Sequence, residues 1–254
     1  MDFTIKPIGN KSAVEIHAET YFSRGHLVLE CFEGFLGIER NAKVYHWTPT
    51  VPDGSFCYSI QTDGTKRGIA QLDFTIEPSK DGVLLKTQVT NLDTHLIDDI
   101  KYNTCLQFKH VDEFRDNEGD YTFLWMESGW TPVTQIRRYV GTGWHRLCQN
   151  YAVLGHEPDG LQDGFMRTWG VSPDRAARAL IAKQSRSGDL AIGICWDRAF
   201  FMRNNMNDSH HCIHSQGQID DLPPKEARNR VGKIFFAPEG LEQLYAKAAR
   251  FFGW

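Results

Sequence analysis

The sequence predicts an all-β protein with a short helix at its carboxyl end. The first observation behind this expectation is a hairpin pattern. Residues 72–77 alternate between apolar and polar side chains, residues 83–90 form a second run suited to a returning strand, and an Asp-Gly pair lies between the two runs. Such alternation is typical of half-buried strands, and Asp-Gly favours a tight turn. We therefore expect two antiparallel strands here.

A second hairpin is expected later in the chain. Two strongly apolar runs, residues 179–184 and 190–196, flank the turn formers Ser187-Gly188-Asp189, an arrangement that favours a reversal of direction. Further strands are predicted at residues 27–32, 121–125 and 231–236. Strand patterns therefore dominate the chain.

The third observation is a helical pattern near the end of the sequence. Apolar side chains recur there at helical spacing, at Leu241, Leu244, Tyr245, Ala248, Phe251 and Phe252. This spacing places them on one face of a helix, and Pro238 and Glu239 suit its first turn. The predicted fold class is all-β, a sandwich on which one short C-terminal helix packs.

Composition and charge restrict the classes of function. The chain has 254 residues, 41% hydrophobic and 24% charged, and no linker-like tract interrupts it, so we expect residues 1–254 to form a single β-sandwich domain. A net charge of −4 with scattered basic residues argues against a nucleic-acid partner. No apolar run is long enough for a membrane span, and the first residues lack the pattern of a secretion signal.

The cysteines indicate the cellular compartment. Six of them are spaced singly, without a CxxC pair, and in a chain of this length that pattern is typical of reduced, mostly buried thiols in a cytoplasmic protein. No nucleotide-binding loop and no GxSxG motif occurs. No pattern in the sequence indicates an oligomeric state.

A histidine-rich segment, residues 209–216, has the strongest chemical signal. Three of the ten histidines fall in it. Side chains alternate faces along a strand, so His210, Cys212 and His214 are expected to share one face. That face is suited to acid–base chemistry or to a transition metal such as zinc or copper, because imidazole and thiolate are ligands of these ions.

Two parts of the chain carry a family resemblance. The first is residues 85–92, which end a strand in Thr-Asn, with residues 96–100 after it; the second runs from residues 212–216 to 221–224, where Leu-Pro-Pro follows a pair of aspartates. Together they resemble the aldose 1-epimerase, or galactose mutarotase-like, superfamily. The resemblance implies a mutarotase-like β-supersandwich and a carbohydrate substrate or ligand.

The resemblance also implies where a reaction would take place. His214 stands near the position of the family's catalytic glutamate, and Thr104 stands near that of a family histidine, so ordinary mutarotation is not implied. Because similar sandwiches serve polysaccharide lyases and other sugar enzymes, the resemblance implies a sugar more firmly than it implies one reaction.

The candidate site residues follow from these observations. A histidine titrates near neutrality, so His214 is predicted to act as a catalytic base or acid, with His110 or His145 as partner. Arg203 is predicted to stabilise developing negative charge on oxygen. Flat aromatic faces and rigid polar groups suit sugars, which makes the following residues candidates for substrate binding: Trp144, Trp169, Arg138 and Asn204. Structural histidines, core tryptophans and a solvated loop at 203–205 remain the alternatives.

The predicted function is proton transfer at a sugar ring, by an epimerase or by a polysaccharide or glycoside lyase, without a cofactor. Two alternatives stay open. One is a carbohydrate-binding sandwich without catalysis. The other is a metal-dependent sugar enzyme in which His210, Cys212 and His214 bind a divalent transition metal.

Overall fold

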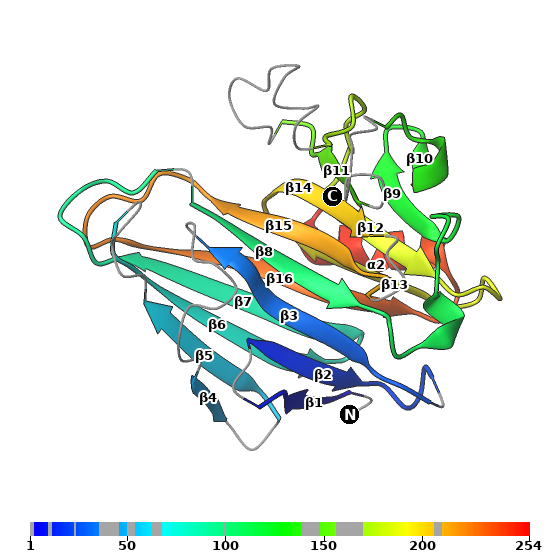
Figure 1. Ribbon diagram of the computed structural model, residues 1–254, viewed down its shortest axis with the longest axis horizontal. Coiled ribbons are helices and arrows are strands. Elements are labelled where there is room, and N and C mark those ends of the chain that lie inside the picture. Colours follow the sequence, from blue (N-terminus) through cyan, green and yellow to red (C-terminus); the bar gives the residue numbers. More distant parts are fainter. Residues whose placement is uncertain are drawn as a thin grey trace.

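Two antiparallel β-sheets form the protein, packed face to face with a helix at one end (Figure 1). The computed structural model describes residues 3–9, 12–22, 24–35, 46–49, 54–61, 68–98, 100–138, 148–155, 170–205 and 210–254. Within these ranges, no helix combines the length and apolar character that crossing a membrane requires.

One sheet has seven strands. Their order across the sheet is β1 (Thr4–Pro7), β2 (Ala13–His17), β3 (Leu27–Phe35), β8 (Ile100–Gln107), β15 (Ile213–Ile219), β14 (Ala199–Asn205) and β11 (Cys148–Ala152). Strands from both halves of the sequence therefore lie side by side, and in Figure 1 β15 lies between β8 and β14.

The other sheet has nine strands. Their order is β10 (Gly129–Pro132), β9 (Thr122–Met126), β12 (Leu180–Gln184), β13 (Ala191–Trp196), β16 (Ala227–Ala237), β7 (Gly82–Asn91), β6 (Ala70–Ser79), β5 (Phe56–Gln61) and β4 (His46–Pro49). Two short 3-10 helices, η1 (Asp112–Phe114) and η2 (Val133–Gln135), lie in connections between the two sheets. Both predicted hairpins are confirmed, as β6 with β7 and as β12 with β13.

The apolar core fills the space between the sheets. In β6, Leu72, Phe74 and Ile76 are fully buried while the residues between them are partly exposed, which is the predicted alternation. Gly82 opens β7 with φ +147, and a Cβ there would lie 1.9 Å from the carbonyl oxygen of Ile234. A glycine is required at this turn because β16 passes so close.

The predicted helix is confirmed as α2 (Leu241–Phe252). It packs on the nine-stranded sheet through Tyr245, whose ring stacks on that of Trp125 at 3.5 Å. Trp130 donates a hydrogen bond from its indole nitrogen to the carbonyl of Leu241 at 3.0 Å. Trp196 is buried in the core, where its ring meets that of Tyr102 edge to face at 5.0 Å. These tryptophans are structural.

The histidine-rich segment forms a shorter strand than predicted. His211 has a left-handed backbone, φ +46, so the alternation of faces cannot begin at His210, and strand β15 starts only at Ile213. Cys212 and His214 nevertheless remain close, with Sγ and Nε2 3.1 Å apart.

Candidate functional site

A lateral row of polar and ionisable side chains crosses five strands of the seven-stranded sheet. Paired residues of antiparallel strands present their side chains on the same face. Cys105 pairs with Glu30 on one side and with His214 on the other, His214 pairs with Arg203, and Arg203 pairs with Asn150. We call these five residues the outer row.

The outer row lies on the face of the sheet that points away from the nine-stranded sheet. The intervening positions Leu29, Leu106 and Ile213 belong to the core between the sheets, and neighbours in a strand point to opposite faces. Within the row Cys105, His214 and Asn150 are buried, whereas Glu30 and Arg203 are partly exposed. A concentration of polar groups on this scale is not needed for packing and indicates a functional face.

His214 is held at both ring nitrogens. Its Nδ1 lies 3.3 Å from the amide nitrogen of Asn103, and its Nε2 lies 3.1 Å from Sγ of Cys212. Because an amide nitrogen only donates, Nδ1 accepts this bond, and in the neutral ring the proton is then on Nε2, facing the sulfur. The ring, in a side chain only 2% exposed, is thus fixed in orientation.

Arg203 lies directly opposite His214. The predicted loop at 203–205 is wrong, because these residues end strand β14. Arg203 donates from Nε to the side-chain oxygen of Asn150 at 2.7 Å, and this bond directs the guanidinium along the outer row. The pair thus places an imidazole and a guanidinium on adjacent strands of one sheet face, an arrangement suited to stabilising negative charge beside a proton transfer.

Three ligand atoms for a soft metal ion meet at the same place. The sulfurs of Cys105 and Cys212 and a ring nitrogen of His214 lie within 4.8 Å of one another. His210 is absent from this group of described residues; it lies in the preceding turn, where its carbonyl accepts a hydrogen bond from the backbone of Phe108 at 3.2 Å. Sequence reasoning missed Cys105, because only strand pairing brings it to His214.

Gln107 is the next residue of β8 after Cys105 whose side chain lies on the face of the outer row. Its amide nitrogen donates to the carboxylate of Glu30 at 2.8 Å, while its side-chain oxygen is buried without a hydrogen-bond partner among the described residues. A buried acceptor of this kind carries a cost of about 1–3 kcal/mol unless a ligand or water donates to it. It is therefore a candidate contact for a ligand hydroxyl.

His110 belongs to a different group. Its ring stacks on that of His26 at 4.4 Å, and no contact between His110 and His214 occurs in the described part of the chain. His26 lies beside Glu15 and His17, and ligand atoms of these three residues lie within 4.8 Å of one another. Sequence reasoning missed Glu15 and His17, although their alternation in Ala13–His17 was a usable signal.

The remaining predicted residues lie apart from the outer row or outside the description. Asn204 points into the sandwich, where its side-chain oxygen accepts from the hydroxyl of Tyr151 at 2.9 Å. Burial raises the pKa of Tyr151, and the positive charge of Arg138 opposes this rise. His145, Trp144 and Trp169 lie outside the described residues. The roles predicted for all of these residues stay predictions.

Thr104, which stands near a histidine position of the resembled family, has a structural role. Its hydroxyl donates to the carbonyl of Ser215 at 2.7 Å and accepts from the indole of Trp196 at 3.1 Å. Both bonds lie in the core, between the two sheets. Thr104 therefore anchors a core tryptophan and faces away from the outer row.

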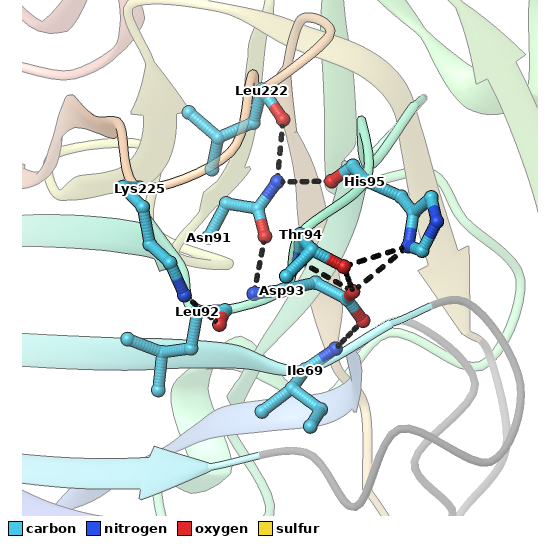
Figure 2. A network of polar contacts seen from close by, with 8 residues as sticks. All are labelled: Ile69, Asn91, Leu92, Asp93, Thr94, His95, Leu222 and Lys225. Atoms are coloured by element: carbon cyan, nitrogen blue, oxygen red, sulfur yellow. Dashed lines mark hydrogen bonds and ion pairs between the residues drawn. The ribbon is translucent and has the colours of Figure 1, made fainter.

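The two segments that carry the family resemblance meet in space (Figure 2). The amide nitrogen of buried Asn91 donates to the carbonyls of His95 and Leu222, both at 2.8 Å. Its side-chain oxygen accepts from the backbone of Asp93 at 2.8 Å. A hydrogen bond from the backbone of Thr94 is the largest cause that lowers the pKa of Asp93 to about 2. This network fixes the loop after β7 to the loop after β15.

A buried lysine also has a structural explanation. Lys183 and Asp116 are each 2% exposed, with Nζ 3.5 Å from the carboxylate and 3.0 Å from the hydroxyl of Thr122. Burial lowers the pKa of Lys183, which the charge of Asp116 partly offsets. The carboxylate also accepts from the backbones of Gly119 and Tyr121. Every charge here is paired, so this group stabilises the turn before β9.

Comparisons with known proteins support the fold. No family model and no curated protein matches the sequence. Among solved structures, the α-N-acetylgalactosaminidase NagBb from Bifidobacterium bifidum has a TM-score of 0.54 at 9% identity, covering 99% of this chain and 37% of that chain. A galactose mutarotase-like protein from Lactobacillus casei has a TM-score of 0.49 at 10% identity, covering 92% and 99% of the two chains. One from Clostridium acetobutylicum has a TM-score of 0.45 at 10% identity, covering 78% and 68%.

These identities show a likeness of fold alone. At that level the predicted all-β sandwich is confirmed, with two large antiparallel sheets and one short C-terminal helix. The chain spans 37% of the length of the Bifidobacterium enzyme, so nothing of that enzyme's activity follows for this protein.

Proposed function

We propose that the protein acts on a carbohydrate at the outer face of the seven-stranded sheet and transfers a proton at a sugar ring, with His214 as the acid or base. The outer row is the observation that carries this proposal, because it aligns an imidazole with a fixed guanidinium on adjacent strands. Further support comes from the likeness of fold to a solved glycosidase in complex with GalNAc, used as an analogy.

Each group has a defined task in this reaction. His214 removes a proton from a ring carbon, or returns one, and its orientation is set by Asn103 and Cys212. Arg203 stabilises the negative charge that develops on the oxygen of a carbonyl or carboxylate group attached to that carbon. The buried side-chain oxygen of Gln107 accepts a hydrogen bond from a sugar hydroxyl. Delivery of a proton to the opposite face of that carbon by a second acid or by water gives epimerisation, whereas loss of a leaving group from the adjacent carbon gives elimination.

Access is a condition of the proposal. His214 is 2% exposed, so its ring must become accessible when substrate binds, as happens in enzymes whose loops open and close over the site. Slow labelling of His214 by a histidine-modifying reagent measures how rarely the ring is accessible, and a bound substrate is expected to slow the labelling further.

The experiment is a substrate screen with three variants. Sugars are followed by proton NMR for anomeric or epimeric change, and uronic-acid oligosaccharides by the absorbance of an unsaturated product. On any substrate found, His214→Gln is expected to lower kcat by roughly 10²–10⁴-fold and Arg203→Gln by roughly 10²-fold. His95→Gln, at an exposed histidine, is the matched control. Turnover unchanged in His214→Gln removes the proposed base, and binding without turnover across the panel supports a non-catalytic sugar-binding protein instead.

The cluster of Cys105, Cys212 and His214 favours a second candidate, a metal-dependent sugar enzyme. Two thiolates and an imidazole within 4.8 Å suit zinc, which would hold and polarise a substrate oxygen at the outer row. Elemental analysis of the purified protein tests this candidate. One equivalent of transition metal that is lost in Cys212→Ser and in Cys105→Ser supports it, and metal-free protein with full turnover contradicts it.

A further inference from the structure

A second group of metal-ligating side chains lies at the edge of the same sheet face. Glu15 and His17 alternate along β2, and His26 immediately precedes β3. Nε2 of His17 lies 2.9 Å from one carboxylate oxygen of Glu15, and Nε2 of His26 lies 3.7 Å from the other. The rings of His17 and His26 have their centroids 5.2 Å apart. We call these three residues the edge cluster.

Strand pairing brings the edge cluster together. Ile16 pairs with Leu27 in the antiparallel ladder of β2 and β3, so the next positions outward, His17 and His26, lie opposite each other. Ala13 pairs with Glu30 of the outer row, and Glu15 and His17 follow Ala13 at alternate positions. The edge cluster therefore shares the face of the outer row.

A third imidazole covers the edge cluster. The ring of His110 stacks on that of His26 at 4.4 Å. Gly25 makes this approach possible, because its φ is +94 and a Cβ there would lie 2.0 Å from the carbonyl oxygen of His110. The loop after β8 is thus closely packed against the residue before His26, and three of the ten histidines gather around one carboxylate.

An ordinary ion pair does not account for this arrangement. Glu15 needs only one protonated histidine as a partner, and three protonated rings in contact would repel one another. Burial is the main cause that lowers the pKa of both His26 and His110, which favours the neutral imidazole, the form that binds metals. Lys109 acts in the same direction on both rings, while Glu15 opposes it.

We propose that Glu15, His17 and His26 bind a divalent transition metal ion, with zinc as the best-fitting ion. Two imidazole nitrogens and one carboxylate oxygen are a known zinc ligand set, and it leaves one position open. The ligand atoms lie within 4.8 Å of one another, whereas ligands about 2 Å from a shared tetrahedral ion are about 3.3 Å apart. Small side-chain rotations close that difference. His110 stacks on the ring of His26 and so restricts its orientation.

The side chains are accessible to an incoming ion. They are 24%, 23% and 33% exposed for His17, His26 and Glu15 respectively. An ion can therefore exchange with solvent, unlike at the buried cysteines of the outer row. The proposed metal site does not depend on sugar turnover, so this proposal and the proposed function can be disproved separately.

The test is zinc binding to untagged full-length protein that has been freed of metal by a chelator. Titration calorimetry with zinc alone is expected to show one site that weakens by on the order of 100-fold in His17→Ala and in His26→Ala, since each removes one of three ligands. His95→Ala is the matched control, because His95 also contacts a carboxylate, that of Asp93 at 3.2 Å, but lacks a second imidazole. Thermal unfolding checks that each variant is folded, and His17→Gln replaces any variant that is not.

A spectroscopic measurement separates the edge cluster from the buried cysteines. Cobalt bound by nitrogen and oxygen ligands lacks the intense thiolate-to-metal absorption that cysteine ligation gives, so cobalt-loaded protein is expected to show only weak visible bands. Cys212→Ser is expected to keep the site. Absence of zinc binding at tens of micromolar ion, or binding whose stoichiometry and affinity are unchanged in the double variant of His17 and His26, overturns the proposal. So does binding that Cys212→Ser abolishes.

Discussion

Histidines gather twice on one face of the seven-stranded sheet, and the two groups differ in their surroundings. His214 is 2% exposed, and its ring contacts an amide and a thiol. The side chains of His17 and His26 are 24% and 23% exposed, and both contact a carboxylate. Histidine therefore occurs once in a buried site, beside an amide and a thiol, and once in a partly exposed site, beside a carboxylate.

The difference shows that burial determines which role a histidine side chain is suited to. A buried, fixed imidazole is suited to one reaction at one atom, but any change to it disturbs the packing around it. A half-exposed imidazole beside a carboxylate exchanges protons and ions with solvent at little cost to the fold. If this division holds, the two groups must respond in opposite ways to reagents, mutations and acid.

The largest expected difference concerns thiol labelling. Cys212 is 2% exposed, so an alkylating reagent should reach it only when the protein opens. Its labelling is therefore expected to be slower by on the order of 10³-fold than in denaturant. Cys57, which is partly exposed, is the internal comparison in the same sample. Mass spectrometry of timed digests measures both, and equal rates would place Cys212 in a wet site and break the comparison.

Mutation of the two histidines should separate them by a smaller margin. His214→Ala removes a buried ring and leaves the contacting groups of Asn103 and Cys212 without it, so we expect a loss of about 3 kcal/mol in the free energy of unfolding. His17→Ala removes a partly exposed ring at an edge strand and should cost below about 1 kcal/mol. Urea unfolding of metal-free protein measures both values. Equal losses would show that the edge cluster is as integral to the fold as His214.

Much of the fold follows from local patterns, since alternation, turn formers and helical spacing act over a few residues. The hairpin of β6 and β7 and the helix α2 are examples. The start of β15 was not predictable. The left-handed backbone of His211 interrupts the strand, and the side chains of this segment give no sign of the interruption.

The grouping of side chains at the candidate site was easiest to predict where two residues lie close in sequence. Cys212 and His214 are two apart, so strand geometry was enough to place them together. Cys105 meets His214 through the register of β8 with β15, and His110 meets His26 through the close approach at Gly25. Register between distant strands is set by the whole sheet, and a single sequence does not encode it locally.

Gly25 offers a way to disturb the edge cluster alone. Gly25→Ala introduces a Cβ against the carbonyl of His110 at a positive φ of +94, so we expect a loss of about 2 kcal/mol in unfolding free energy and a weaker zinc site. Gly129→Ala is the matched control, because Gly129 has the same φ and nothing within 4 Å, which leaves only backbone strain. Urea unfolding compares the two. A Gly25→Ala protein as stable as Gly129→Ala would mean that the loop bearing His110 moves freely away from the edge cluster.

The smallest expected effect is a dependence of stability on pH. Burial lowers the pKa of His26 in the folded protein below the value near 6.5 of an unfolded chain. The unfolded state therefore binds more protons just below pH 6.5, so the contribution of His26 is complete above this pH and is lost as the pH falls. Because Glu15 has its pKa lowered as well, it is mostly ionised in both states between pH 7 and about 5 and adds only a small slope of the same sign near the acid end.

Unfolding free energy measured in chelator at intervals between pH 7 and about 5 should thus decrease with acid in the wild type and decrease less in His26→Gln. His95→Gln, at a histidine whose side chain is 87% exposed, is expected to keep the wild-type slope. Added zinc should steepen the loss in the wild type, because protons compete with the ion for the same imidazoles. If the unfolding free energy of His26→Gln has the same pH dependence as that of the wild type, the edge cluster is too exposed to solvent for burial to affect its protonation. The contrast between the two groups of histidines would then depend on His214 alone.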